Sequence, residues 1–395
     1  TPTYIVDYIV HQTVGPLLEG KTPSQVGGAA SGARGAGAQH AAPGAGAAIK
    51  RPERSAAQSK DAPSPLRILD PACGSGSFLL GAYQFLLDWY LQEYLKEPDR
   101  WLKGKQPPLE RMTGATAGGG YRLAIEERKR ILMNHIYGVD IDPQAVEVTK
   151  LSLLLKVLEG EGVAGQMSLF PERVLPDLGR NIKCGNSLIG PEFYEGKLDL
   201  PDEETARRVN AFDWRAEFPD AMASGDGGFD GGGFDAVIGN PPYIRIQALQ
   251  EWAPLEVAHY KTAYRAASKG NYDIYVVFVE KGLALLNERG RLGYILPHKF
   301  FNAQYGEPLR RLLSDGRHLS KIVHFGDQQV FAGATTYTCL LFLEQGGRSE
   351  FQFVRAHDLA GWRAGEAQVE GTIPAASTGP AEWNFVIGAS RDIFD

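Results

Sequence analysis

The sequence predicts an α/β protein built on a doubly wound, mostly parallel sheet with an antiparallel edge. The main observation is that short, strand-like apolar runs alternate along the chain with long helical patterns, which is typical of βαβ units. A second observation is a composition of 43% hydrophobic and 22% charged residues, which is typical of soluble globular proteins. The 395 residues fit two or three domains of about 150 residues each.

The elements follow one another in a regular order. The strand-like runs are residues 66–72, 136–142, 181–190, 234–239, 290–297, 322–327 and 335–345. The helical patterns between them are residues 77–95, 143–158 and 271–286. Residues 89–130 separate the first two strand–helix units, and we expect them to form a helical insertion with its own Gly-rich loop.

Composition divides the chain into four parts. Between Gly27 and Ala48, 17 of 22 residues are Gly or Ala with no apolar periodicity, and this bias predicts a flexible linker over residues 21–65. Residues 1–20 precede it, and residues 66–345 contain the alternating pattern of the main domain. Residues 346–395 are irregular, and a second Gly cluster at 224–233 predicts an exposed loop.

Charge, cysteine content and hydropathy narrow the class of protein. The net charge of −6 argues against a general nucleic-acid coat but leaves a DNA enzyme open, because phosphate contacts need only a local basic surface. Cys73, Cys184 and Cys339 are odd in number and widely spaced, so we expect a reducing, cytoplasmic compartment. No run reaches about 18 apolar residues, which excludes a predicted membrane span, and the eight histidines form no metal motif.

The first motif is the Gly-rich turn DPACGSGSF at residues 70–78, between a strand and a helix. Gly74 and Gly76 permit a tight turn whose backbone N–H groups can approach a ligand at the helix N-terminus. The third Gly of the dinucleotide fingerprint is absent, and Asp70 is suited to a positive group rather than to a pyrophosphate. A purely structural turn is the alternative interpretation.

The second motif is Asp140, at the end of the next strand-like run. In doubly wound folds, an acidic residue at this position hydrogen-bonds the ribose hydroxyls of the ligand. Asp142, which directly precedes Pro143, fits a helix N-cap better than Asp140 does. The spacing of 70 residues between Asp70 and Asp140 exceeds the usual spacing of about 20, and the insertion at 89–130 accounts for the difference.

The third motif is Asn240-Pro241-Pro242-Tyr243, directly after the buried-strand pattern FDAVIG. A rigid turn explains the prolines but not the flanking Asn and Tyr at the carboxyl edge of the sheet, where such folds bind ligands. The amine of adenine is a poor nucleophile, because its lone pair is delocalised into the ring. The Asn240 side-chain carbonyl and the Pro241 backbone carbonyl can accept both amine hydrogens, and Tyr243 offers a ring for stacking.

These motifs together resemble the amino-adenine DNA methyltransferases that use S-adenosylmethionine (SAM), in the γ arrangement, where the SAM motif precedes NPPY. The likeness is to the methyltransferase part of type IIG restriction–modification and phage-defence enzymes. It covers residues 1–345 apart from the Gly/Ala-rich insertion, and it includes TPTYIVDYIV, DPACGSGSF, YGVDIDP, CGNSLIG, NPPY and QVFAGATTYT in the family's order. The resemblance implies a Rossmann-like SAM-dependent methyltransferase fold with residues 1–20 packed on the SAM site.

The resemblance also implies which residues hold SAM. Asp70 and the backbone at Ala72 and Gly74 would hold the methionine end, Asp140 the ribose, and Ile141 one face of the adenine. Asn186 stands where the family usually has Asp to meet the adenine amine, so a carbonyl acceptor remains without its charge. The complete cofactor set is Thr3, Asp70, Ala72, Cys73, Gly74, Gly76, Phe78, Asp140, Ile141, Asn186 and Ser187. Cys73 is expected as a small packed residue rather than as a nucleophile.

For the target base, the resemblance implies that Asn240, Pro241, Pro242 and Tyr243 are catalytic. Tyr243 and Phe331 would sandwich an adenine flipped out of the duplex, and a core role for Phe331 is the alternative. The predicted DNA-contacting residues are Arg245, Lys261, Arg265 and Lys269, for which a solvated surface is the alternative. Asp273 lies in the fifth motif, and its contact with SAM is left open. No metal is implied.

Double-stranded DNA is the partner that the resemblance implies, within a restriction–modification or phage-defence system. A restriction nuclease or a target-recognition domain is expected outside these residues, with 346–395 as the possible start of the recognition region. One alternative is methylation of a release-factor glutamine amide or of an RNA amine, because these amines are equally delocalised. Another is a non-catalytic SAM-fold module that binds DNA. A nicotinamide dehydrogenase is disfavoured by Asp70 and the missing third Gly.

Overall fold

The computed structural model describes residues 1–27, 65–112, 120–159, 175–195, 202–222, 232–331, 337–356, 358–366, 368–385 and 387. Residues 28–64 of the predicted Gly/Ala-rich linker lie outside these ranges, as does most of the second Gly cluster. The start of the predicted linker is structured instead, because Pro23–Val26 form a short 3-10 helix (η1) with Pro23 and Val26 buried. Within the described ranges, no helix is both long enough and apolar enough to cross a membrane.

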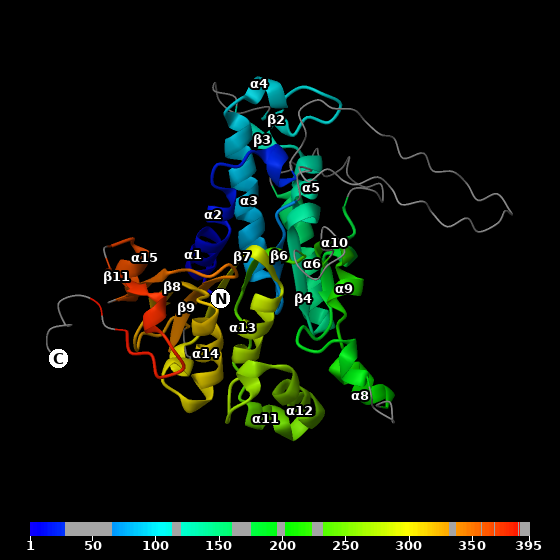
Figure 1. The fold of residues 1–395 in the computed structure, drawn as a ribbon. Coiled ribbons are helices and arrows are strands. Elements are labelled where there is room, and N and C mark those ends of the chain that lie inside the picture. Colours follow the sequence, from blue (N-terminus) through cyan, green and yellow to red (C-terminus); the bar gives the residue numbers. More distant parts are fainter. Residues whose placement is uncertain are drawn as a thin grey trace, which may run out of the picture.

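The described chain folds around a nine-stranded sheet (Figure 1). Its order is β11 (Val369–Pro374), β10 (Glu350–Arg355), β8 (Leu319–His324), β9 (Thr338–Glu344), β7 (Leu286–Pro297), β6 (Phe234–Gly239), β1 (Ile68–Asp70), β4 (Ile136–Asp140) and β5 (Ile182–Cys184). From β7 to β5 every pairing is parallel, whereas β9 is antiparallel to both β7 and β8. The structure therefore confirms the predicted doubly wound, mostly parallel sheet with an antiparallel edge.

Each predicted strand is present, although most are shorter than the apolar run that predicted them. Two further strands, β10 and β11, lie beyond residue 345. β10 pairs in parallel with β8, and β11 pairs antiparallel to β10. The predicted boundary at residue 346 therefore falls between strands of one continuous sheet. The role of residues 346–395 in target recognition stays a prediction.

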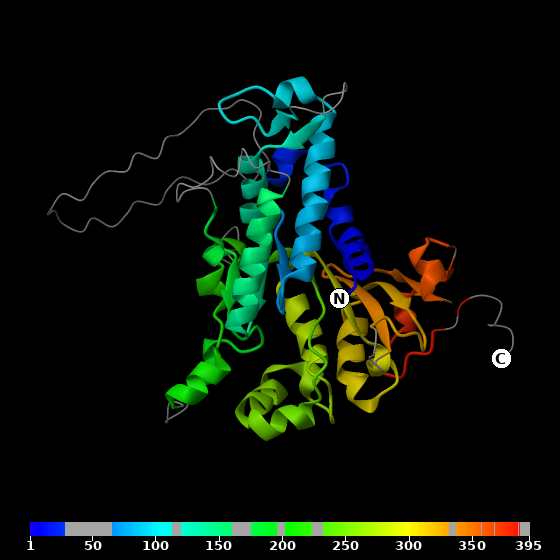
Figure 2. The ribbon, with the colours of Figure 1, turned by 180° about the vertical axis from the view of Figure 1, so that it is seen from behind.

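Two layers of helices cover the two faces of the sheet. One layer contains α1 (Thr3–Thr13), α3 (Ser77–Leu95), α5 (Ile125–His135) and α6 (Pro143–Leu158), and α1 lies beside α3 in both views (Figures 1 and 2). The other contains α9 (Trp214–Glu217), α10 (Pro219–Met222), α13 (Tyr275–Ala284) and α14 (Glu307–Asp315). The predicted helices at 77–95 and 143–158 have the expected bounds, because Gly76 precedes one and Asp142 caps the other before Pro143.

The sequence predicts a helical insertion between β1 and β4. This prediction is wrong in part, because the insertion also contains two strands. After α4 (Pro98–Trp101) it contains an antiparallel hairpin of β2 (Leu109–Arg111) and β3 (Tyr121–Leu123). Pro107 and Pro108 explain the difference, because a pair of prolines cannot continue a helix and favours extended backbone before it.

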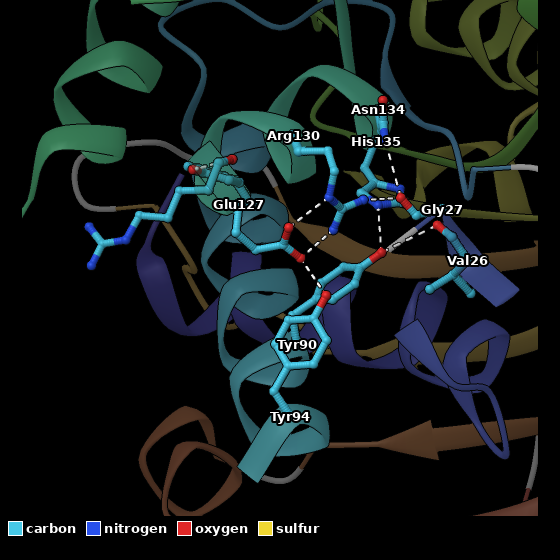
Figure 3. Close-up of polar contacts among 10 residues, drawn as sticks. Val26, Gly27, Tyr90, Tyr94, Glu127, Arg130, Asn134 and His135 are labelled. Carbon is cyan, nitrogen blue, oxygen red and sulfur yellow. Dashed lines mark hydrogen bonds and ion pairs between the residues drawn. The ribbon is translucent and has the colours of Figure 1, made fainter. Parts of the chain in front are cut away.

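Polar side chains of α3 and α5 bind the backbone at Val26 and Gly27 (Figure 3). Arg130 donates to the Gly27 carbonyl, and Asn134 donates to the same oxygen at 3.2 Å. Glu127 accepts from Nε of Arg130 at 2.7 Å and from the Tyr94 hydroxyl. The buried Glu127 carboxylate is thus paired with the half-buried Arg130 guanidinium and hydrogen-bonded, as burial of its charge requires.

His135 completes this network at Leu66. Its Nδ1 lies 2.6 Å from the Leu66 carbonyl, which can only accept, so Nδ1 carries a proton. Its Nε2 lies 2.9 Å from the Tyr90 hydroxyl and accepts from it. Burial lowers the pKa of His135 to about 4, so the ring is neutral at neutral pH. The network fixes the end of the N-terminal segment against the strand that leads into the Gly-rich turn.

Candidate active site

The Gly-rich turn after β1 is fastened to the end of β4. The Gly74 N–H donates to Oδ2 of Asp140 at 2.7 Å, and the Cys73 N–H donates to the Val139 carbonyl at 3.0 Å. Gly76 has a φ of 82°, and a Cβ there would lie 2.9 Å from Cγ2 of Thr149. Only glycine fits both the left-handed backbone and this close approach. The turn therefore brings Asp70 and Asp140 to one edge of the sheet.

Asp70 is 2% exposed, and its Oδ1 accepts from the Ala72 N–H at 3.0 Å. Burial raises the pKa of Asp70 to about 8, because the charged carboxylate is removed from water. Gly239, at the end of β6, lies directly against this carboxyl: a Cβ on Gly239 would be 2.7 Å from Oδ1, and its φ is 156°. Gly239 could not be singled out from the sequence, because its contact with Asp70 joins two neighbouring strands.

The motif Asn240-Pro241-Pro242-Tyr243 follows β6 directly. The Tyr243 hydroxyl donates to Oδ1 of Asn240 and also lies 3.1 Å from the Ile295 carbonyl. On its other side, Nδ2 of Asn240 donates to Oγ1 of Thr1 at 3.3 Å. The N-terminal segment therefore reaches the NPPY motif. Burial raises the pKa of Tyr243 above its usual range, so its hydroxyl stays protonated.

A first cavity, of about 300 Å³, lies between the Gly-rich turn and the NPPY motif. Seven of the residues predicted from the sequence line it: Ala72, Asp140, Ile141, Asn186, Ser187, Asn240 and Pro242. The far wall comes from α8 (Glu203–Val209), α11 (Ile246–Trp252) and α12 (Pro254–Ala263). Its residues include Arg208, Trp252, Glu256 and Tyr260, which the sequence did not indicate. We call this space the cofactor cavity.

A second cavity, of about 600 Å³, lies on the other side of the motif. It is lined by Tyr243, Arg245, Asp273, Pro297, His298, Lys299, Asn302, Ala303 and Tyr337. We call it the target cavity. Asn240 and Pro242 line the cofactor cavity, whereas Tyr243 lines the target cavity, so the four-residue motif separates the two spaces.

Comparison with known proteins identifies the family of this chain. The model of the Eco57I restriction-modification methylase family matches residues 134–331, half of the chain. The chain belongs to this family.

Two curated relatives and one solved structure are also similar. The type II restriction enzyme and methyltransferase RM.Eco57I of Escherichia coli is 35% identical over 296 residues, which are 75% of this chain and 26% of that protein. The adenine-specific methyltransferase PglX of Streptomyces coelicolor is 24% identical, over 73% of this chain and 22% of that protein. A nuclease-deletion mutant of the Type ISP restriction-modification enzyme LlaGI, solved with a DNA substrate mimic, has a TM-score of 0.49 and 16% identity, over 90% of this chain and 24% of that one. The chain spans about a quarter of the length of these proteins.

The cofactor cavity of this restriction-modification methylase fits SAM. Both oxygens of Asp140 are held by backbone N–H groups, from Gly74 at 2.7 Å and Asp142 at 3.0 Å, so the carboxylate is oriented at the sheet edge for two hydroxyls. Ile141 is 51% exposed beside it and offers an apolar face for a ring. The buried Asp70 carboxyl behind the turn suits the cationic methionine end.

Several predicted cofactor residues do not line the cofactor cavity, among them Cys73, Phe78 and Thr3. Cys73 is 5% exposed, and burial raises the pKa of its thiol, which agrees with a packed residue rather than a nucleophile. Phe78 is buried in the core at the start of α3. Thr3 is exposed at the start of α1, and Thr1 is the threonine that touches Asn240. Direct SAM contacts of Thr3 and Phe78 stay predictions.

Phe331 does not line the target cavity. It is half-buried and packs against the core on the α1 side of the sheet, whereas Tyr243 packs against the core on the α13 side. Tyr337 instead lines the target cavity with 46% of its surface exposed. Its ring is stacked on His298 at an interplanar angle of 11°, and its carbonyl accepts from the His298 N–H at 3.3 Å.

The four predicted DNA-contacting residues are all exposed, but they lie in three places. Arg245 lines the target cavity with Lys299, while Lys261 lies on α12. Arg265 and Lys269 line a separate hollow, together with Ser268, Glu307, Pro308 and Arg311. Lys269 is paired with Glu307, which also binds Arg311, so part of this positive charge is neutralised. In the described part of the chain, no cluster of His, Cys, Asp and Glu is arranged to hold a metal ion.

Proposed function

We propose that this chain transfers the methyl group of SAM to the N6 amine of an adenine in double-stranded DNA, as the methyltransferase part of a restriction–modification or phage-defence system. The observation that carries the proposal is that the NPPY motif borders both spaces, because Asn240 and Pro242 line the cofactor cavity and Tyr243 lines the target cavity. An amine held there has an electrophile on one side and its purine ring on the other.

The residues of the NPPY motif compensate for the low nucleophilicity of the adenine amine. SAM, when bound, supplies a methyl group activated by its sulfonium. Oδ1 of Asn240 and the Pro241 carbonyl accept the two amine hydrogens, so the nitrogen lone pair is turned out of conjugation and toward the cofactor cavity. The N–C bond forms as the S–C bond breaks, and the surplus proton leaves to water afterwards. Preorganised acceptors lower the barrier because they do not reorganise during the reaction.

The target cavity has the character that a flipped base requires. Tyr243, in the segment that follows β6, and Tyr337, directly before β9, present rings to the cavity, and Arg245 and Lys299 supply positive charge for the phosphates beside the base. Moving a base out of the duplex stack costs a few kcal/mol of free energy, and stacking of the base on these two rings offsets that cost. Adenine as the base is supported by the PglX relative, whose name states adenine specificity.

Methylation of a glutamine amide or of an RNA amine is the competing function, because the same acceptors suit those amines. Membership of a restriction-modification methylase family favours DNA over either. A non-catalytic module is disfavoured by the intact pair of cavities on the two sides of Asn240.

The deciding experiment uses methyl-labelled SAM with unmethylated double-stranded DNA, with RNA and with a release factor, comparing the chain with its Asn240→Ala variant. We expect label in DNA as N6-methyladenine and its loss in the variant. Label confined to the release factor or to RNA would overturn the DNA assignment. Label in DNA as a methylated cytosine would overturn the base assignment.

A further inference from the structure

We propose that Glu256 recognises the exocyclic amine of the cofactor's own adenine. Glu256 lies on α12, which follows the NPPY motif, and no sequence motif pointed to it. It is 4% exposed and lines the cofactor cavity, so it is a buried charge directed at the space where SAM fits. The inference concerns cofactor selection, and it rests on SAM binding in this cavity.

Asn186, the residue first expected at this amine, is already engaged through its amide oxygen. Its Oδ1 accepts from the Leu188 N–H at 3.1 Å. Asn186 and Tyr260 both line the cofactor cavity. One lone pair of the amide oxygen is therefore the only acceptor site that Asn186 keeps for an amine.

Glu256 lies next to this group. Glu256 and Tyr260 are one helical turn apart on α12, so they share a face of the helix, and both line the cofactor cavity together with Asn186. Among the described residues that line the cofactor cavity, the only carboxylates are Asp140 and Glu256. The Asp140 carboxylate is fixed at the ribose end by backbone N–H groups. Glu256 is the carboxylate left for the adenine end.

The partner of Glu256 leaves room for a ligand. Arg208 of α8 donates to Oε1 at 3.0 Å and to Oε2 at 3.4 Å. A carboxylate oxygen has two lone pairs, so each oxygen keeps one acceptor site after pairing with Arg208. The ion pair also neutralises the buried charge, which makes its burial tolerable. A hydrogen bond from an amine to this carboxylate is charge-assisted and therefore among the stronger ones.

A purely structural role is the alternative, in which Glu256 and Arg208 only hold α12 against α8. The two roles differ in their response to the cofactor's base. A structural ion pair affects every ligand of the cavity alike, whereas an acceptor for the amine discriminates between bases.

The experiment measures binding without methyl transfer. Isothermal titration of residues 1–395 with S-adenosylhomocysteine, and with its inosine counterpart, gives the ratio of the two dissociation constants. The inosine compound carries a carbonyl oxygen in place of the amine. The proteins are the unchanged chain, Glu256→Gln, and the matched control Arg208→Gln, which breaks the ion pair but keeps the carboxylate. A thermal unfolding curve for each variant verifies that it is folded.

We expect the unchanged chain to bind the adenine compound about 10-fold or more tightly than the inosine compound, since a hydrogen bond to a charged group is lost. Glu256→Gln should reduce this preference to about equality or reverse it, because a Gln amide can donate to the inosine oxygen. Arg208→Gln should keep the preference. Equal weakening of both ligands by Glu256→Gln would overturn the inference and leave SAM in the cavity. Failure of S-adenosylhomocysteine to bind the unchanged chain would overturn the cofactor assignment and the inference together.

Discussion

The hydroxyl of Tyr243 donates a hydrogen bond to Oδ1 of Asn240, so the two ends of the NPPY motif hold each other. The same hydroxyl lies 3.1 Å from the Ile295 carbonyl, which can take the hydrogen bond over. The acceptor required for the amine is thus kept oriented in the free protein. In the proposed reaction, Oδ1 of Asn240 becomes available to the amine when the Tyr243 hydroxyl donates to the Ile295 carbonyl instead.

This relationship separates two contributions of Tyr243, its ring and its hydroxyl. Tyr243→Phe keeps the ring and frees Asn240, so we expect kcat/KM for DNA methylation to change by less than about 5-fold. Tyr243→Ala removes the stacking surface and should lower kcat/KM by roughly 10- to 100-fold, the value of one base–aromatic stack. Single-turnover rates with labelled SAM measure both. Equal losses in the two variants would show that the hydroxyl, rather than the ring, is the important part.

The second ring of the target cavity gives a further test. Tyr337 is exposed in the cavity and Phe331 is packed on the opposite side of the sheet, so we expect Tyr337→Ala to lower kcat/KM by roughly 10-fold or more. Phe331→Ala should mainly lower the melting temperature, because it removes core contacts. Tyr337→Phe is the matched control and should retain activity. The reverse pattern, with activity lost in Phe331→Ala alone, would restore the original assignment of Phe331.

Part of the candidate site could be predicted from the sequence alone. Groups that are close in sequence were predictable: the Gly-rich turn, the acid that ends β4, and the NPPY motif at the end of β6. Each follows a strand directly, and parallel strands bring their carboxyl ends to one edge. The predicted helices at 77–95 and 143–158 have the observed bounds because local signals, Gly76 and Asp142, set them.

Contacts made through tertiary packing were not predictable in this way. Tyr337 reaches the target cavity because β9 runs antiparallel to β7, which places the start of β9 beside Pro297. Glu256 reaches the cofactor cavity through the packing of α12 against α8. Gly239 is required because Asp70 lies against it from the neighbouring strand. None of these contacts has a periodicity or spacing that a single sequence displays.

The raised pKa of Asp70 predicts that SAM binding depends on pH. With a pKa of about 8, the carboxyl is largely protonated at pH 6 to 7 in the free protein. The cationic methionine end favours the ionised form, so binding releases a proton and the affinity rises as the pH increases from about 6 to 8. Titration calorimetry in two buffers of different ionisation enthalpy measures that proton. Asp70→Asn should remove the pH dependence, and a flat profile for the unchanged chain would contradict this assignment.

The buried His135 predicts a pH-dependent stability that can be traced to one residue. Its pKa is lowered to about 4 by burial, whereas in the unfolded chain it is near 6.5. Below about pH 6.5 the unfolded state binds a proton that the folded state does not, so stability is lost as the pH falls toward 4. At pH 5 the loss from this residue is about 2 kcal/mol.

Urea unfolding at pH 7 and pH 5 measures this loss. His135→Gln keeps a donor for Leu66 and an acceptor for Tyr90 without titrating, so its free energy of unfolding should fall less between the two pH values than that of the unchanged chain. His11→Gln, at an exposed position of α1, is the control and should keep the full pH dependence. If the unchanged chain and His135→Gln lose the same free energy, His135 does not stay neutral in the network that holds Gly27 and Leu66.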